Sequence, residues 1–552
     1  MDDGESAAPP LHRSGSTVHG AVNHRGRPAA RRASGQWTSA FFIIGMETGE
    51  RSAYYGISSN LINYLSGPLR EKTAVAAAAV NTWAGVTSAL PVVAAFLADA
   101  YLGRYWTIVA ASILYVLGLG LLTLSSVLPT FRLLECNIDS SLCSPSKQQL
   151  ALFYFSLYLV AVAQAGQKPC LQAFGADQFD DNDPEECKFK SSFFNWWNFC
   201  LIAGSTVTTI CLNYVQDNFS WVAGFGIPCV FMALGLLLFL LGTSTYRFYN
   251  VLHGKNPISG ASEALLTRFK EWRAGSEQGE LRQALLSNFD LVNEEDSTVK
   301  NADREEGKGL FRLFPIWASC LIYAVVIAQA STFFTKQGST MDRRVGSKFQ
   351  VPSASLQCSI GISAIAFIPV YDRLLIPLAR RFTGEPSGIT MLQRIGTGVA
   401  LSVVVMLVAA LVEMKRLRTC REMGLVDLPD EEIPMSMWWL MPQNMLCGIA
   451  NVFTVVGLQE FFYDQVPEAL RSLGLAFCLS IFGIGNFISG FIVSAIDLIT
   501  SSQGGSWFPD NLNRAHLDYF YLLLAGLSAI ELLIFLYSAQ SYVYKTKGNP
   551  AM

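Results

Sequence analysis

Three ionisable residues stand close together in the segment EtgER, within an otherwise apolar stretch. Glu47, Glu50 and Arg51 occupy positions i, i+3 and i+4, so on a helix their charged groups point to one side. The candidate partner is Lys168, the single basic residue of the apolar stretch 149–174. Two acids and two bases sum to zero when ionised, so one proton on either Glu leaves net positive charge. The spacing therefore predicts proton-controlled anion binding; a permanent ion-pair lock between two helices is the alternative.

A second acid, Glu460, lies in another apolar stretch, in the opposite half of the chain. We predict that it contacts a solute held between the halves, although a carboxyl satisfied by local polar groups near the membrane edge is the alternative. Of the flanking aromatic residues we select Tyr55 as a solute contact. In DAYLGR, Asp99 and Arg104 flank a Gly turn and predict a cytosolic latch, with a helix cap plus a positive-inside charge as the alternative.

The composition indicates what must surround these groups. The chain has 552 residues, 51% hydrophobic and only 15% charged, with a mean hydropathy of +0.33. Such a chain buries apolar surface against lipid and is not an ordinary soluble enzyme. The formal net charge is −3, which offers no basic footprint for nucleic acid. We recognise no ATP-binding loop, paired zinc spacing or hydrolase elbow, and predict no enzyme activity, metal or cofactor.

Apolar segments long enough to cross a bilayer recur along the chain. We predict twelve membrane-spanning helices, at 38–65, 74–98, 105–128, 149–174, 192–215, 220–243, 314–335, 354–378, 391–414, 437–463, 472–499 and 517–541. The predicted fold class is an all-α membrane protein, with six helices on each side of a charge-rich central segment.

The predicted domains are a disordered cytosolic tail (1–36), a six-helix bundle (37–245), a charged cytosolic linker (246–312), a second six-helix bundle (313–541) and a cytosolic C-terminal tail (542–552). Within the linker, residues 265–273 have the pattern of an amphipathic helix, lying either on the membrane or on the protein. The excess of Lys and Arg in the inner loops predicts that both termini are cytosolic. Cys136 and Cys143 then share an outer loop, as a disulfide or as two free thiols.

Five motifs occur in order along the chain: EtgERsAYYGI at 47–57, FLADAYLGRYWT at 96–107, FGADQFD at 174–180, SFFNWWNF at 192–199 and GLQEFFYDQVPEALRSLG at 457–474. Together they closely resemble the plant nitrate and peptide transporter family. This family is a branch of the proton-coupled oligopeptide transporters within the major facilitator superfamily. The resemblance implies two six-helix halves that rock about a central cavity, and symport driven by a proton gradient.

Residue by residue, the resemblance implies that Glu47, Glu50 and Arg51 form the ExxER proton-coupling motif, with Lys168 as their salt-bridge partner. It also implies solute contacts at Asn198 and at Glu460.

Thr107 falls where one member of the family is regulated by phosphorylation. The resemblance thus names a kinase as a candidate partner, while a structural Thr is the alternative. Two departures bear on the solute. Ser58 replaces an Arg that grips peptide carboxylates in bacterial and animal members, and Ile327 lies where a nitrate-binding His occurs in one member.

The sequence therefore predicts a proton-coupled symporter of a small anionic or zwitterionic solute, such as nitrate, a short peptide or a plant hormone or metabolite. The alternatives are a transporter-fold sensor, and a passive facilitator or exporter. Its predicted partners are the solute, protons and the lipid bilayer, with the plasma membrane favoured over the vacuolar membrane. The oligomeric state stays open.

Overall fold

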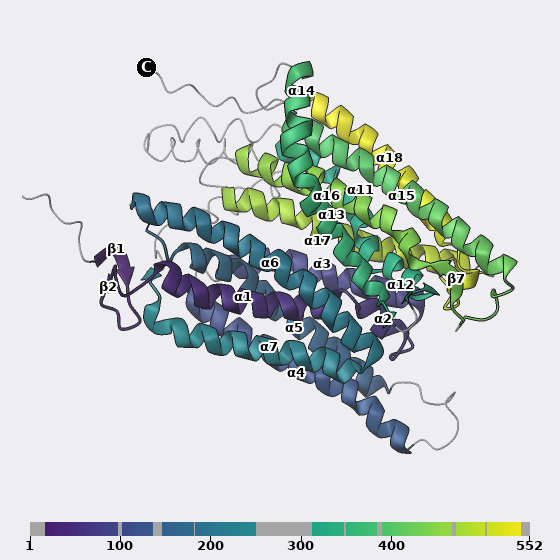
Figure 1. Ribbon diagram of the computed structural model, residues 1–552, viewed down its shortest axis with the longest axis horizontal. Helices are drawn as coiled ribbons and strands as arrows, with labels where there is room; N and C mark the ends of the chain where they lie inside the picture. The colour runs from purple at the N-terminus through teal and green to yellow at the C-terminus, as the bar shows by residue number, and fades with distance from the viewer. Residues whose placement is uncertain are drawn as a thin grey trace, which may run out of the picture.

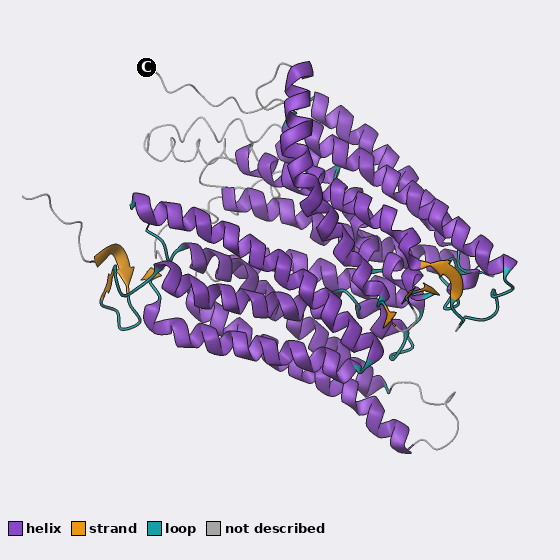
Figure 2. Ribbon diagram, viewed as in Figure 1, coloured by secondary structure: helices purple, strands orange, loops and turns teal. Residues whose placement is uncertain are grey.

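The protein is a bundle of long helices in two groups, seen in the computed structural model (Figures 1 and 2). The structure describes residues 17–97, 102–135, 146–180, 183–249, 312–346, 349–383, 389–429, 431–465, 471–502 and 505–542. The predicted amphipathic helix of the linker, the C-terminal tail beyond residue 542, Asp99, Cys136 and Cys143 lie outside these residues.

The N-terminal half contains the helices that the sequence predicted as its first six spans. They are α1 (Gln36–Ser58), α2 (Leu61–Ser66), α3 (Thr73–Leu97), α4 (Arg104–Glu135), α5 (Lys147–Ala176), α6 (Pro184–Asn218) and α7 (Trp221–Leu241). The first predicted span is divided into α1 and α2. Side chains that precede the helices fix where three of them begin: Ser146, Asp183 and Ser220 accept hydrogen bonds from the first-turn N–H groups of α5, α6 and α7.

The C-terminal half is built in the same way, but its first two spans are interrupted. Residues 312–318 form a first helical segment, followed by α11 (Leu321–Ala328), η3 (Gln329–Ser331), α12 (Phe333–Ser339), η4 (Ser353–Gln357), α13 (Cys358–Val370), η5 (Tyr371–Leu375), α14 (Ile376–Thr383), α15 (Met391–Glu422), η6 (Met437–Leu440), α16 (Met441–Asp464), α17 (Arg471–Ser502), η8 (Leu512–Arg514) and α18 (Leu517–Gln540). A capping box of Thr390 and Gln393 starts α15.

Short strands lie at the ends of the bundle. They are β1 (Thr17–Val22), β2 (Pro28–Ala30), β3 (Phe248–Tyr249), β4 (Met341–Asp342), β5 (Arg344–Val345), β6 (Phe349–Gln350) and β7 (Ile433–Ser436). The first three form a sheet in the order β2-β1-β3. The prediction of a disordered tail to residue 36 is therefore wrong from Thr17 onward, because β1 pairs with β3 at the far end of the N-terminal half.

Many large apolar side chains on the outside of the bundle are exposed. Leu241, Phe491, Leu498 and Tyr537 each expose more than 60% of their surface, as expected for side chains that face lipid rather than water. Within the described residues, nine helical segments are long and apolar enough to cross a membrane. The helix α1 is not among them, since it carries three charged residues in its middle.

The two halves pack against each other along α3 and α17, and a set of polar contacts joins them at one end of the bundle. We call the end where α1 begins and α7, α16 and α18 end the tail end, and the opposite end, with α2, α12 and β7, the α2 end (Figure 1). Polar contacts join the halves at the α2 end. They are Asn63 Nδ2 to Ser353 Oγ (3.1 Å), Gln357 Nε2 to Ser59 O (2.8 Å), Lys336 Nζ to Ser66 Oγ (2.7 Å) and Thr73 N to Asp510 Oδ1 (3.0 Å). The α2 end is therefore closed between the halves.

Candidate functional site

The ionic residues of α1 form a compact group inside the N-terminal half. Arg51 Nε donates a hydrogen bond to Glu47 Oε1 at 2.8 Å and lies 3.3 Å from Glu50 Oε2. Glu47 and Glu50 are buried, with 2% and 0% of their surface exposed. Among the described residues, Glu47 Oε2 and both oxygens of Glu50 have no hydrogen-bond partner. One guanidinium thus serves two carboxylates and leaves three of their four oxygens available to a proton or another donor.

Lys168 approaches this group from α5, one residue before Pro169. Its ammonium interacts electrostatically with Arg51, Glu50 and Glu47. No ion pair of Lys168 shorter than 4 Å occurs in the described part of the chain. The structure therefore brings the four predicted groups together as an Arg–Glu pair with a second, unpaired cation beside it.

Polar side chains that the sequence reading missed lie near this cluster. Gln164 and Gln167, on α5 just before Lys168, are buried, and neither amide has a hydrogen-bond partner among the described residues. The hydroxyl of Tyr115 on α4 is also buried and has no hydrogen-bond partner among the described residues. The signal in the sequence was QAGQK, in which both amides fall within one helical turn of Lys168. Buried polar groups without partners are uncommon, which marks this region as a site rather than plain core.

The predicted contact Tyr55 lies one turn after Arg51. Its ring meets Tyr54 edge-on at 5.2 Å, and Tyr54 stacks on Trp83 of α3 at 5.6 Å. Tyr55 is only partly buried. Its hydroxyl is thus carried on a stiff aromatic group beside the charged cluster.

The latch residue Arg104 begins α4 at the tail end, after Gly103, whose φ of 75° suits glycine alone. Arg104 Nη1 donates to Asp177 Oδ2 at 2.6 Å. Asp177 is the C-cap of α5. An ion pair therefore ties α4 to α5 at this end.

Glu460 lies near the C-terminal end of α16, again at the tail end, with about half of its side chain exposed. Its Oε2 accepts a hydrogen bond from Arg394 Nη1 of α15 at 3.3 Å, and the guanidinium lies 4.7 Å above the ring of Tyr371. These residues line a cavity of about 330 Å³. The pair matches Arg104 and Asp177 in position, since each joins an Arg early in one helix to an acid at the end of the next. The solute contact predicted for Glu460 stays a prediction, and its geometry is that of a tail-end ion pair.

Two further predicted residues lie on other helices. Thr107, in the first turn of α4, is buried, and its hydroxyl donates to Gly103 O at 2.9 Å. A hydroxyl in this state is already used by its own helix. Asn198 is part of α6, and its side chain lies outside the described part of the structure.

The C-terminal half holds buried acids that the sequence reading did not select. Glu413 of α15 accepts hydrogen bonds from Arg416, one turn later, at 2.6 and 2.8 Å, and from Gln337 of α12. Glu531 of α18 is 4% exposed. The signal for Glu531 was plain, since it is the only charged residue of the apolar run YFYLLLAGLSAIELLIFLYSA.

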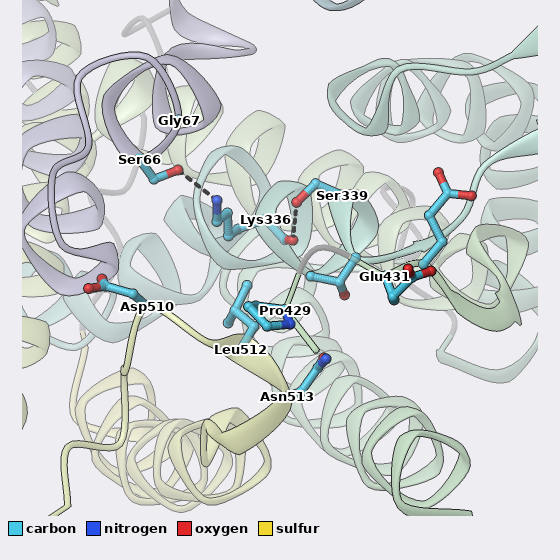
Figure 3. Close-up of a pocket in the computed structure, with 11 residues that line it drawn as sticks. Ser66, Gly67, Lys336, Ser339, Pro429, Glu431, Asp510, Leu512 and Asn513 are labelled. Atoms are coloured by element: carbon cyan, nitrogen blue, oxygen red, sulfur yellow. Dashed lines mark hydrogen bonds between the residues drawn. The ribbon is translucent and has the colours of Figure 1, made fainter. Parts of the chain in front are cut away.

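A polar cavity of about 320 Å³ lies between the halves at the α2 end (Figure 3). Lys336 of α12 points from the C-terminal half toward Ser66 of α2, and Asp510 also lines the cavity. Lys336 thus provides a charged contact that must break if the halves separate at this end.

The tail end of the N-terminal half is held by a buried ionic network. Arg247, fully buried, donates to both oxygens of Glu186, at 2.7 and 3.3 Å, and to Ser34 O and Gln178 O. Burial alone would raise the pKa of the Glu186 carboxyl, but these donors, the Asp180 N–H and Gln36 hold it below its ordinary value of 4.5. This network fastens Arg247, the residue before β3, to the start of α6.

Comparison with known proteins agrees with this geometry. The POT family model (PTR2) matches residues 105–508. Protein NRT1/PTR FAMILY 5.10 of Arabidopsis thaliana is 54% identical over 539 residues, covering 95% of this chain and 96% of the relative. NRT1/PTR FAMILY 5.14 of the same plant is 50% identical, covering 96% and 97%.

Solved structures give the same fold. The crystal structure of an auto-inhibited POT family peptide transporter matches with a TM-score of 0.70 at 20% identity, covering 93% of this chain and 99% of that one. A POT family transporter in complex with 5-aminolevulinic acid matches with a TM-score of 0.65 at 14% identity, covering 93% and 99%. The predicted twelve-helix fold of the major facilitator type is confirmed.

The family match, with the fold, thus defines a multi-pass membrane transporter, not an enzyme. The chain belongs to the POT family, within its NRT1/PTR group, whose members carry peptides or related solutes.

Proposed function

We propose that the protein is a proton-coupled symporter of a small anionic or zwitterionic solute that works by alternating access. The observation that carries the proposal is the cluster of Glu47, Glu50, Arg51 and Lys168. Its four groups cancel in charge when all are ionised, and the carboxylates retain three oxygens without partners among the described residues.

A proton on Glu47 or Glu50 changes what the cluster attracts. It removes one negative charge, so Arg51 and Lys168 together carry one uncompensated positive charge. In a low-dielectric interior such a charge strongly favours an anionic group nearby. Each of the two, solute and proton, therefore raises the affinity of the site for the other. Loss of the proton restores the pairing of Arg51 and releases the anion.

The nature of the solute is supported by the charges in the site. The cation centre favours a carboxylate or nitrate, and Tyr55 and Asn198 are proposed as neutral contacts. A zwitterion also fits the solved relative that binds 5-aminolevulinic acid, which carries both charges. Ser58 is neutral, so a peptide carboxylate would have to bind Arg51 or Lys168 instead.

The orientation proposed from the inner Lys and Arg residues puts the tail end in the cytosol. The contacts at the α2 end then make this conformation closed to the outside. We propose the tail-end pairs of Arg104 with Asp177 and Arg394 with Glu460 as parts of the inner gate. Asp99 is proposed as a further gate residue, Thr107 as a kinase site, and the plasma membrane as the location.

The test is electrical current in a membrane expressing the protein, at acidic and neutral outside pH, over nitrate, dipeptides, hormones and glycosides. We expect one solute class to evoke an inward current at acidic pH only. Glu50→Gln and Lys168→Ala should abolish it while reaching the surface at normal levels. Glu422→Gln, a change of the same kind at an exposed acid of α15, is the matched control.

Each other outcome has a meaning. Solute movement without current or pH dependence would favour a passive facilitator or exporter. Signalling without solute movement would favour a sensor. Normal proton-driven uptake by both Glu50→Gln and Lys168→Ala would rule out the proposed coupling site. A fluorescent fusion protein located on the vacuole would overturn the plasma-membrane assignment.

A further inference from the structure

The first span of the C-terminal half is broken after its first two helical turns. The helical segment 312–318 ends, Cys320 adopts φ −121° and ψ 7°, and α11 begins at Leu321. The first N–H groups of a helix have no carbonyl partner within that helix. In the interior of a membrane protein these groups need another acceptor.

Glu531 of α18 supplies that acceptor. Its Oε1 accepts hydrogen bonds from the backbone N–H groups of Ile322 at 2.7 Å and Tyr323 at 3.1 Å. The contact joins residues 209 positions apart in the sequence. An acid from the last span thus caps the break in the first span of the same half, where the helix dipole favours a negative charge.

The other oxygen of Glu531 is in a different state. Oε2 is buried and has no hydrogen-bond partner among the described residues, and the same holds for the hydroxyl of Ser528, one turn earlier on α18. A proton on Oε2 would turn this oxygen into a donor within one helical turn of an unused hydroxyl. The carboxyl can therefore exist in two forms with different bonding.

Among the residues that the structure describes, no cation compensates the carboxylate. The titratable groups that face it are Cys320 and Tyr323, with Cys478 of α17 beside Cys320. The α15 residues Ile395 and Val399, which cluster with Phe535 one turn after Glu531 on α18, are apolar. No ion pair involves Glu531 within the described part of the chain. A buried carboxylate without a compensating cation is costly, and binding a proton removes that cost by making the group neutral.

The capped segment is connected to the parts that move in alternating access. Tyr323 also donates its hydroxyl to Asn451 Oδ1 of α16 at 2.7 Å. One turn of α11 thereby links α18 with α16. Ala324, the next residue, packs against α17 so closely that a Cβ on Gly485 would lie 2.3 Å from its side chain. The helix α17 in turn touches α3 of the other half, where Asn81 Nδ2 donates to Ser489 Oγ at 3.0 Å.

We propose that Glu531 is a second proton-binding residue of the transport cycle, and that its charge holds the break at the start of α11. This inference rests on the proposed function. The ionised carboxylate keeps the N–H groups of Ile322 and Tyr323 capped and the span bent. When a proton adds to Oε2, the bonds to α11 weaken and the break relaxes, and the proton leaves again when the carboxylate returns to the cap.

The test compares Glu531→Gln with Glu531→Asp and with the exposed control Glu422→Gln. The amide of Gln keeps one oxygen for the N–H groups but cannot exchange a proton. We expect Glu531→Gln to reach the surface, to move one charge fewer per solute than the wild type, and to show a flatter dependence of uptake on pH. Glu531→Asp should restore part of that dependence. A uniform loss of rate, with the charge per solute and the pH profile unchanged, would overturn the proposal.

If Glu531→Gln does not fold, the proposal can still be tested on the wild-type protein. Amide hydrogen exchange of the wild-type protein, corrected for the intrinsic rate at each pH, reports the bonds of Ile322 and Tyr323. Protection that falls with acidification supports the proposal, and protection independent of pH contradicts it. If the wild type carries solute without any pH dependence, the proposed function fails, and hydrogen exchange still decides whether Glu531 binds a proton.

Discussion

The contact between Lys336 and Ser66 allows a quantitative test of how the halves are held together. Lys336 Nζ donates to Ser66 Oγ at 2.7 Å across the cavity at the α2 end. A hydrogen bond to a charged group contributes about 1.5 to 3 kcal/mol net, and the lower value applies because the cavity admits solvent. Since about 1.4 kcal/mol corresponds to a factor of ten, Lys336→Met should shift the equilibrium toward the form open at the α2 end about tenfold.

The substitution is a clean one. Met preserves most of the side-chain length, and Ser66 still donates its hydroxyl to Ile62 O at 2.8 Å, so no buried group is orphaned. Spin labels at Phe219 and Val345, both exposed at the α2 end, report the distance between the halves when it is measured by double electron–electron resonance spectroscopy. The background protein needs its accessible cysteines replaced. We expect a second, longer distance to gain population in Lys336→Met.

The matched control is Lys415→Met. Lys415 also makes a charged contact at the α2 end, 3.2 Å above the ring of Trp439, but both residues belong to the C-terminal half. It should leave the distance distribution unchanged. Equal populations in the wild type, Lys336→Met and Lys415→Met would refute the idea that the Lys336 contact holds the halves closed.

Three further predictions concern stability. Arg247→Met should cost about 3 kcal/mol, the low end for breaking a buried pair because Glu186 keeps other donors, and thermal unfolding in detergent measures it. Because hydrogen bonds hold the pKa of Glu186 below 4.5 in the folded protein, its contribution is complete above that pH and is lost as the pH falls through the folded value. Melting curves across about pH 3 to 6 should show this loss in the wild type and less of it in Arg247→Met. Gly398→Ala should destabilise the protein by up to about 3 kcal/mol, since its Cβ would lie 2.8 Å from the backbone N of Thr454, whereas Gly361→Ala, with open space around it, should melt like the wild type.

Much of the architecture follows from local composition. A run of about twenty apolar residues can cross a bilayer as a helix whatever its neighbours are, because the helix makes its backbone hydrogen bonds internally. The predicted spans therefore correspond to described helices, including α1 despite its charges. The pairing of Arg51 with Glu47 is local as well, because helix geometry alone places residues i and i+4 side by side.

The parts that the sequence did not predict involve residues far apart along the chain. The polar composition of the first 36 residues predicts disorder, whereas the hairpin of β1 and β2 is ordered beside β3, which begins 226 positions after β1 ends. Arg394 was not predicted as the partner of Glu460, 66 positions away, and Glu531 was not predicted to cap α11.

The sequence by itself determined that this is a membrane transporter of the POT family with a charged face on its first helix. Only the tertiary structure decided which end of the bundle is closed, which ion pair holds Glu460, and which acid accepts hydrogen bonds from the N–H groups at the start of α11. The physical reason is that periodicity fixes which residues share a face of one helix, whereas the rotation and neighbours of each helix are set by packing among all of them.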